Sequence, residues 1–210
     1  RDIQFLIMDA KQQVMRNHSN LFINHIIIRN YKINDTDHTF LPENVNCDLI
    51  SLDILFICIP KKFIDYYKKI FSSLDISINQ IYCSSYAKSI SYKENFSTIK
   101  NISFIDMGFN KTSIICYHNN EIVFLDVLPI GGNHITKDIS KILKIDLKEA
   151  EYFKLFFYKD QFIFDDKKIS IDLIQNIIFS RIEEILELCV NFFKLNLNLK
   201  KLEDSKMILM

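Results

Sequence analysis

Apolar residues in the N-terminal part of the chain predict alternating α and β elements. Helical spacing predicts a helix over residues 1–18, and a run rich in β-branched side chains predicts a strand over 20–35. Residues 34–48 are polar and predict a loop or a hairpin, whereas the apolar run 49–60 predicts a second strand. The chain is therefore expected to begin as a helix followed by two strands.

A strongly amphipathic helix is predicted over residues 61–75. The apolar pattern of residues 76–85 then predicts a further strand. The order helix, strand, strand, helix, strand is typical of an α/β protein. On the predicted helix we expect four apolar side chains to face the core, namely Phe63, Tyr67, Ile70 and Phe71.

The middle of the chain predicts a β-meander of three short strands, over 101–108, 111–118 and 121–129. The second connection is Asn119–Asn120, and consecutive asparagines favour the type I′ turn of a hairpin. Pro129 is expected to end the meander, because proline cannot donate to a strand ladder.

Three helices and a final strand are predicted after the meander. The helices cover residues 131–145, 146–158 and 171–197, and residues 205–210 read as the start of a buried strand. The last helix has the most regular apolar stripe in the chain and is expected to belong to the core. Its members are Ile174, Ile177, Ile178, Ile182, Ile185, Leu186 and Cys189.

Composition narrows the functional classes. Hydrophobic residues make up 49% of the 210 residues, which is enough for a sizeable core, and Lys+Arg equals Asp+Glu at 26 each. This balance argues against electrostatic binding of nucleic acid. No apolar run has the length of a membrane span, and the cysteines and histidines lack the spacing of metal ligands. The five scattered cysteines are expected to be reduced, buried thiols: Cys47, Cys58, Cys83, Cys116 and Cys189.

The three glycines of the chain, Gly108, Gly131 and Gly132, all lie within residues 103–139. A turn after a strand that carries Asp106, followed by Gly-Gly at a helix start, is a layout that can bind the phosphates of a nucleotide. The alternative is that Gly108 only makes a turn, and that the Gly-Gly pair only forms a tight corner between strand and helix. Spacing alone favours this second interpretation.

The order of the motifs adds a resemblance. The stretches "FIDMGFNKTS" and "GGNHITKDI" followed by "EAEYFK" are similar to the patterns D-[IM]-G-G-G-T, G-x-x-[IV]-T-x-D-I and A-E-x-x-K of the FtsA family of bacterial cell-division proteins, in the actin-like ATPase superfamily. Residues 9–35 and 52–91 resemble the inserted SHS2 subdomain, also called 1C, and its return into the core. The matching positions of the last two patterns are Gly132, Thr136, Asp138, Ile139, Ala150, Glu151 and Lys154.

This resemblance implies an α/β fold: a fragment of an actin-like (RNase H-like) ATPase with an inserted SHS2-type α+β subdomain. It implies an SHS2/1C-like subdomain over 1–76, part of subdomain 1A over 77–100, and a 2A/2B-like half over 101–210. The chain is then expected to be a central fragment of a longer protein.

The resemblance also implies a site for ATP and Mg²⁺. Asp106 would hold Mg²⁺ through water or orient a water molecule, although it could equally cap a turn. Thr136 could instead bond only to its own helix, and Glu151 and Lys154 could form only a surface ion pair. The residues implied to bind the cofactor are Gly108, Lys111, Thr112, Gly131, Gly132, Thr136, Glu151 and Lys154.

Two positions depart from the family pattern. The hairpin that reads G-G-G-T in the family reads Gly108-Phe109-Asn110-Lys111 here, so an aromatic ring stands where phosphate should approach. The A-E-x-x-K helix usually reaches a glycine, and Tyr158 stands there instead. A weak actin-like ATPase is compatible with these changes, and whether the protein is an enzyme stays open.

The leading functional hypothesis is an adaptor of the FtsA type. Such a protein polymerises, binds the C-terminal tail of the tubulin-like protein FtsZ and contacts later division proteins. It is cytoplasmic and peripheral on the inner membrane at the division site, held there by a segment absent from this chain. One alternative is a nucleotide-independent scaffold such as the PilM-type pilus-assembly proteins, and another is a sugar kinase of the same superfamily, which the SHS2-like insertion disfavours.

Overall fold

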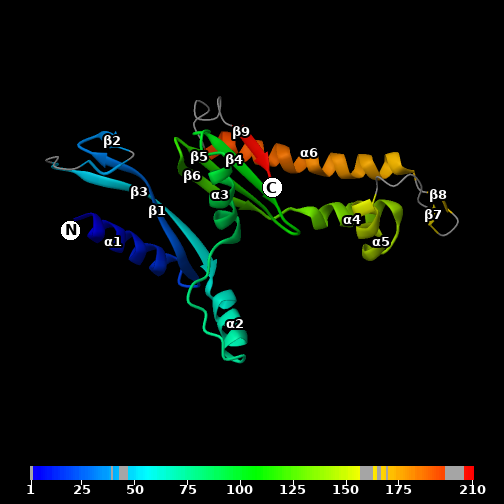
Figure 1. Cartoon of the computed structure of the whole chain (residues 1–210), viewed down its shortest axis with the longest axis horizontal. Helices are drawn as coiled ribbons and strands as arrows, with labels where there is room; N and C mark the ends of the chain where they lie inside the picture. Colours follow the sequence, from blue (N-terminus) through cyan, green and yellow to red (C-terminus); the bar gives the residue numbers. More distant parts are fainter. Residues whose placement is uncertain are drawn as a thin grey trace. The chain divides into compact units, whose positions relative to one another are not determined.

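The computed structural model of the chain contains two compact units, residues 1–97 with 121–123 and residues 98–120 with 124–210. Each unit is considered by itself below (Figure 1). Tyr158, which departs from the family pattern, lies outside the described residues. The structure describes residues 2–38, 40–42, 47–156, 163–164, 167–168, 170–196 and 206–210.

The first unit is built on a long antiparallel pair of strands. Strands β1 and β3 pair along their whole length, and the short β2 joins the far end of β1 to give the sheet order β2-β1-β3. The helix and the two strands predicted up to residue 60, and the helix after them, are confirmed. The elements are α1 (Asp2–Asn17), β1 (Leu21–Ile33), β2 (Thr36–His38), β3 (Ile50–Pro60), α2 (Lys61–Ser72) and α3 (Ser84–Asn95).

Two predictions for this unit are wrong. Residues 76–85 do not form a strand: residues 76–83 have no regular structure, and Ser84 and Ser85 begin α3. Apolar alternation marks a strand only where another strand completes its hydrogen bonds, and no described strand pairs with this segment. On α2, the side chains expected to face the core are exposed, Phe63 by 57% and Tyr67 by 49%, and only Ile64 of this helix is buried.

Ile70 and Phe71 are also exposed, so all four of the residues assigned to the core of α2 lie at the surface. Helical periodicity identifies the apolar face of a helix correctly, but it carries no information on what covers that face.

The second unit is built on a mixed sheet with the order β6-β5-β4-β9. Strand β4 pairs antiparallel with β5, as the meander predicts, and parallel with β9. The final strand is present, but the prediction that it is buried is wrong, because Met207 and Leu209 are exposed. All three predicted helices are present. The elements are β4 (Ile102–Met107), β5 (Thr112–His118), β6 (Glu121–Leu128), α4 (Gly132–Leu143), α5 (Leu147–Phe156), β7 (Ile163–Phe164), β8 (Lys167–Lys168), α6 (Ile171–Asn196) and β9 (Lys206–Leu209).

The turn between β5 and β6 confirms the type I′ prediction. Asn119 and Asn120 have φ values of 51° and 69°. A type I′ turn requires a positive φ at both central residues, and asparagine tolerates it better than most residues.

Helices α4, α5 and α6 share one apolar core. The stripe predicted on α6 is largely confirmed, with Ile174, Ile185 and Cys189 fully buried and Ile182 and Leu186 half-buried. This core holds α4 and α5, which carry four of the candidate site residues, on one rigid support. Its buried members are Ile135, Ile139, Ala150, Phe153, Ile174, Ile177 and Ile178.

The five cysteines are free, but their burial differs from the prediction. Cys116 and Cys189 are buried, and burial raises the pKa of Cys116 to about 12 and that of Cys189 to about 11. These two thiols are therefore chemically inert near neutral pH. The prediction of burial is wrong for Cys47, which is exposed, and Cys58 and Cys83 are only half-buried.

Candidate functional site

The turn between β4 and β5 is fastened to the start of α4. Within the turn, the amide of Gly108 donates to the carbonyl of Lys111 at 2.9 Å. From α4, the amide of Gly132 donates to the carbonyl of Gly108 at 2.9 Å, and the amide of Asn133 donates to that of Phe109 at 2.6 Å. Residues separated by more than twenty positions are therefore joined through their backbones at the glycines.

Gly131 is glycine because the turn lies directly against it. A Cβ at this position would come within 2.4 Å of the carbonyl oxygen of Gly108 and 2.8 Å of the amide nitrogen of Lys111. Its φ of −167° is ordinary extended backbone, so contact and not conformation excludes a side chain. At Gly132 the nearest atom to an added Cβ is 3.7 Å away, which is ordinary van der Waals contact.

The first amides of α4 already have acceptors inside the protein. Besides Gly132 and Asn133, Gly131 donates to Nδ1 of His134 at 3.1 Å, and His134 donates to the carbonyl of Gly131 at 2.9 Å. A helix start binds an anion through amides that lack a partner. The resemblance implies that the Gly-Gly pair presents such amides to phosphate, whereas here the amides of Gly132 and Asn133 hold the turn.

The turn itself presents a different set of groups. Phe109 is 61% exposed at its tip, Lys111 is exposed beside it, and Nδ2 of Asn133 donates to Oδ1 of Asn110 at 2.9 Å. Within the described part of the chain, no acceptor is recorded for the amides of Phe109, Asn110 and Lys111. Successive amides of a turn are a common anion-binding arrangement.

Thr136, Glu151 and Lys154 form a compact polar cluster between α4 and α5. Nζ of Lys154 lies 2.7 Å from Oε2 of Glu151 and 2.9 Å from Oγ1 of Thr136, and the Thr136 hydroxyl donates to the same Oε2. The ammonium also donates to the carbonyl of Gly132 at 3.2 Å. All three protons of the ammonium thus have acceptors, which makes Lys154 a residue that positions its neighbours.

This cluster differs from the surface ion pair that spacing allows. The Lys154 side chain is only 15% exposed and Thr136 is buried. Burial acts to raise the pKa of Glu151, but the hydrogen bonds from Lys154 and Thr136 and the charge of Lys154 outweigh it and lower that pKa. Glu151 is therefore an anion at neutral pH, and its second oxygen, Oε1, has no recorded donor among the described residues.

Of the residues predicted to bind a cofactor, Gly108, Gly131 and Gly132 meet at the turn, and Lys154 connects them to Thr136 and Glu151. The remaining residues are placed differently.

Asp106 lies half-buried near the end of β4, opposite Ser113. Thr112 is fully buried, and its hydroxyl donates to the carbonyl of Ile130 at 2.7 Å, so it serves the fold. The described residues contain no group of three side chains that could bind a metal ion directly, and a Mg²⁺ ion near Asp106 would need ligands from water or phosphate.

One strong contact was not predicted. The guanidinium of Arg181 on α6 makes a bidentate pair with Asp138 on α4, with distances of 2.6 and 2.9 Å. Hydrogen bonding to Asp138 raises the pKa of Arg181, so the pair remains charged. The family pattern contains Asp138, but its partner 43 residues away is visible only in the fold.

The architecture of the chain is similar to that of a solved structure. The whole chain superposes on a chain of the PilM-PilN type IV pilus biogenesis complex with a TM-score of 0.70 and 12% sequence identity, covering 56% of that chain. MreB5 of Spiroplasma citri, solved with ADP, aligns less closely, with a TM-score of 0.47 and 17% identity over 73% of this chain and 68% of that one. The chain therefore has a mixed α/β fold like that of the PilM-PilN chain, and the α/β fold that the resemblance predicts is confirmed.

Sequence comparison finds FtsA proteins among the relatives of the chain. A model described as "Cell division protein FtsA" matches residues 103–175. FtsA of Agrobacterium fabrum is 22% identical over 205 residues, covering 89% of this chain and 46% of that protein. FtsA of Bacillus subtilis is 26% identical over 197 residues, covering 87% of this chain and 44% of that protein. The protein is a distant homologue of FtsA over most of the chain.

A shorter match has a higher identity. FtsA of Streptococcus pneumoniae is 47% identical over 51 residues, which is 24% of this chain and 11% of that protein. The chain spans less than half the length of each of these three relatives. None of the described helices is both long and apolar enough to cross a membrane.

Proposed function

We propose that this chain is part of a cell-division protein of the FtsA type, an actin-like adaptor that binds ATP and assembles with copies of itself. The observation that carries the proposal is the joint formed by the β4–β5 turn, the start of α4 and the polar cluster on α5. It brings together, in one continuous hydrogen-bonded unit, the three sequence patterns that resemble FtsA.

In the proposed site, the turn would face the phosphates of ATP. The amides of Phe109, Asn110 and Lys111, together with the Lys111 ammonium, supply donors and positive charge for an anion. Asp106 would carry the negative charge that attracts Mg²⁺ through its water ligands. When bound, Mg²⁺-ATP would promote assembly of the protomers through its charge. The proposal assigns no reaction step to these residues.

Glu151 would receive the sugar of the nucleotide. A charged carboxylate with an open oxygen accepts hydrogen bonds from hydroxyl groups, and the lowered pKa keeps it charged. Lys154 would hold Glu151 in place instead of contacting the ligand, because its three protons are already donated.

The partners of the proposed function are the C-terminal tail of FtsZ, neighbouring protomers and later division proteins. We assign the contacts with neighbouring protomers to the SHS2/1C-like residues 1–76, and the binding of the FtsZ tail to the 2B-like helices within 101–210. Residues 77–100 would form the return into subdomain 1A. The protein would act on the cytoplasmic side of the inner membrane, at the division septum.

The direct test is binding of a fluorescent peptide with the sequence of the FtsZ C-terminal tail, followed by anisotropy. We expect saturable binding by the protein, and no binding of a peptide with the same residues in scrambled order. Equal binding of both peptides, or of neither, would contradict the FtsA-type function.

A second candidate is a scaffold that keeps the actin-like fold without using nucleotide. It is supported by Phe109, which stands in the turn where the family has glycine, and by the first amides of α4, which are already bonded. If Mg²⁺-ATP binds only after Phe109→Gly and Asn110→Gly are introduced together, this scaffold replaces the nucleotide-dependent adaptor.

A further inference from the structure

The first carbonyl of α4 lies against a largely buried cation. Nζ of Lys154 donates to the carbonyl oxygen of Gly132 at 3.2 Å. Because the Lys154 side chain is only 15% exposed, water screens its charge poorly at this point. The ammonium therefore acts on one particular peptide group, the group that joins Gly132 to Asn133.

The same peptide group is bonded to the β4–β5 turn. Its N–H is the amide of Asn133, which donates to the carbonyl oxygen of Phe109 at 2.6 Å. The C=O and N–H of a peptide group are joined by resonance, so a cation at the oxygen makes the N–H a stronger donor. The influence of Lys154 on α5 is therefore passed through the start of α4 to the turn.

This series of hydrogen bonds ends at an open amide. The Phe109 carbonyl belongs to the peptide group whose N–H is the amide of Asn110, and no acceptor is recorded for that amide within the described residues. The two peptide groups, Gly132–Asn133 and Phe109–Asn110, are thus polarised in the same sense, each by the donor before it. We call these two groups the peptide relay.

The two lysines near the turn differ in how they can act on a ligand. Lys111 is exposed beside the turn, so its ammonium can contact an anion directly. All three ammonium protons of Lys154, in contrast, are donated inside the protein, and none is left for a ligand. An effect of Lys154 on a bound anion must therefore pass through the groups to which it is bonded.

We propose that Lys154 is a positioning residue for phosphate, which it does not contact. Through the peptide relay it holds the turn and strengthens the amide of Asn110 as a donor to an anion. This inference rests on the nucleotide site of the proposed function and deepens it. Since the same ammonium also holds Glu151, one lysine would serve both the sugar end and the phosphate end of the ligand.

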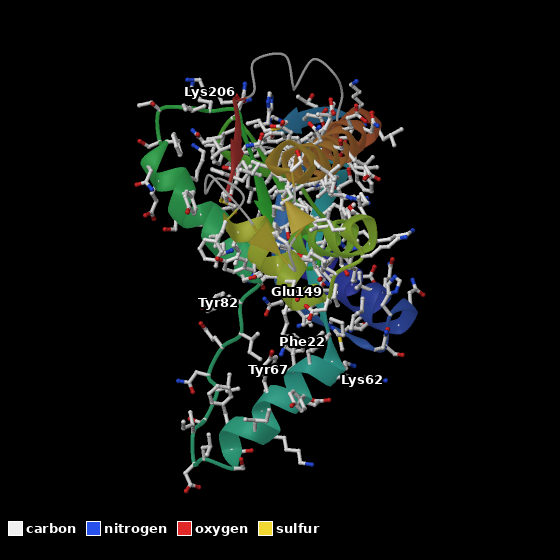
Figure 2. The ribbon with its side chains drawn as sticks, turned by 90° about the vertical axis from the view of Figure 1, so that its right-hand side faces the viewer. Phe22, Lys62, Tyr67, Tyr82, Glu149 and Lys206 are labelled. Atoms are coloured by element: carbon white, nitrogen blue, oxygen red, sulfur yellow. The ribbon has the colours of Figure 1, made fainter. Side chains whose placement is uncertain are left out.

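The first test is calorimetric titration with inorganic tripolyphosphate, which has no sugar and therefore cannot use Glu151. Lys154→Met should weaken its binding about fivefold or more, and Lys154→Arg, which keeps the charge and the donors, should restore most of it. The control is Lys148→Met, which removes the same charge from an exposed position of the same helix. Lys148 precedes Glu149, which Figure 2 labels on α5.

The second test observes the peptide relay without any ligand, by nuclear magnetic resonance of protein labelled at asparagine nitrogen. An amide proton moves to lower chemical shift when its hydrogen bonding or its polarisation weakens. The amide signals of Asn133 and Asn110 should therefore move to lower shift in Lys154→Met and stay in place in Lys148→Met. Asn119 and Asn120, at the other end of β5, should not move in either variant, which shows that the sheet stays folded.

The proposal is overturned if tripolyphosphate binds Lys154→Met as tightly as the unchanged protein, or if Lys148→Met weakens binding equally. It is also overturned if binding weakens while both amide signals stay in place, since Lys154 would then contact the anion directly.

The unchanged protein separates this inference from the proposed function. If it binds neither Mg²⁺-ATP nor tripolyphosphate, the nucleotide site and the role of Lys154 are both overturned. If it binds both and the lysine variants do not differ, the nucleotide site stands and only the role of Lys154 is overturned.

Discussion

Helices α2 and α6 begin from the same sequence signal and have opposite surroundings. Both carry apolar residues at helical spacing, and both predict a helix with one face toward a core. In α6 that stripe is buried, with Ile174 completely covered by α4 and α5. In α2 the corresponding face is open, and Ile64 alone is covered.

The difference teaches that periodicity defines a face and tertiary structure decides its use. The core of the second unit is formed by three helices that close on one another, and its sheet adds buried residues such as Phe104 and Ile114. Residues 2–97 bury far fewer apolar side chains in the described part, chiefly Ile33, Ile57 and Ile64. Most apolar side chains in the described part of the first unit are therefore not fully buried.

The largest difference in stability is expected when an isoleucine is replaced by alanine in each of the two helices. Ile174→Ala removes a fully buried side chain and should lower the free energy of unfolding by about 2–5 kcal/mol. Ile70→Ala on α2 should change it by only about 0.5 kcal/mol, because this side chain is 39% exposed. Urea unfolding measures both, and similar losses would break the comparison between the two helices.

A second pair of variants compares the neighbouring glycines. Gly131→Ala must push the β4–β5 turn away from α4 and should cost about 3 kcal/mol. Gly132→Ala adds a methyl group in open contact at the first position of a helix, and should be neutral or stabilising by about 0.5 kcal/mol. Equal thermal midpoints for the two variants would show that the turn does not lie against Gly131.

A smaller effect is expected at the ion pair between α4 and α6. Asp138→Asn should cost about 1 kcal/mol, since the pair is bidentate but about a quarter of each side chain remains exposed to solvent. Glu184→Gln is the control: it removes the more exposed partner of the same Arg181 and should change stability less. A larger loss from Glu184→Gln would contradict the geometry.

The two units should also respond to acid at different pH. Burial lowers the pKa of His25, which stacks against Tyr82, so the folded state resists its protonation and loses stability as the pH falls below the ordinary range of histidine. The lowered pKa of Glu151 gives stability that is present near neutral pH and is lost only as the pH falls below the ordinary range of glutamate. His25→Phe should remove the first loss of stability, and Glu151→Gln should remove the second. Thermal unfolding at a series of pH values across both ranges measures each loss. A first loss that survives in His25→Phe would assign it to another group.

Local signals account for most of the elements. The β-meander, the Asn119–Asn120 turn and helices α4 to α6 could be predicted, because periodicity and turn chemistry act over a few residues. The role of Gly131 could not, since it depends on the approach of a turn more than twenty positions earlier.

The candidate site also has features that the local sequence predicts and features that depend on distant contacts. The residues of the family pattern could be selected from the sequence, but their arrangement could not. That Lys154 donates to Thr136 and Gly132, and that Arg181 holds Asp138, are consequences of packing between helices. The bond from Gly131 to His134, in contrast, is local to the start of α4.

The measurement that tests the central claim most directly is calorimetric titration of Mg²⁺-ATP into the protein and two variants. If the turn, α4 and α5 form a nucleotide site, the protein binds Mg²⁺-ATP and Glu151→Gln weakens binding about tenfold or more. The control Glu183→Gln, an exposed carboxylate on α6, should bind like the unchanged protein. No binding by the unchanged protein, or equal binding by both variants, would contradict a nucleotide site at this joint.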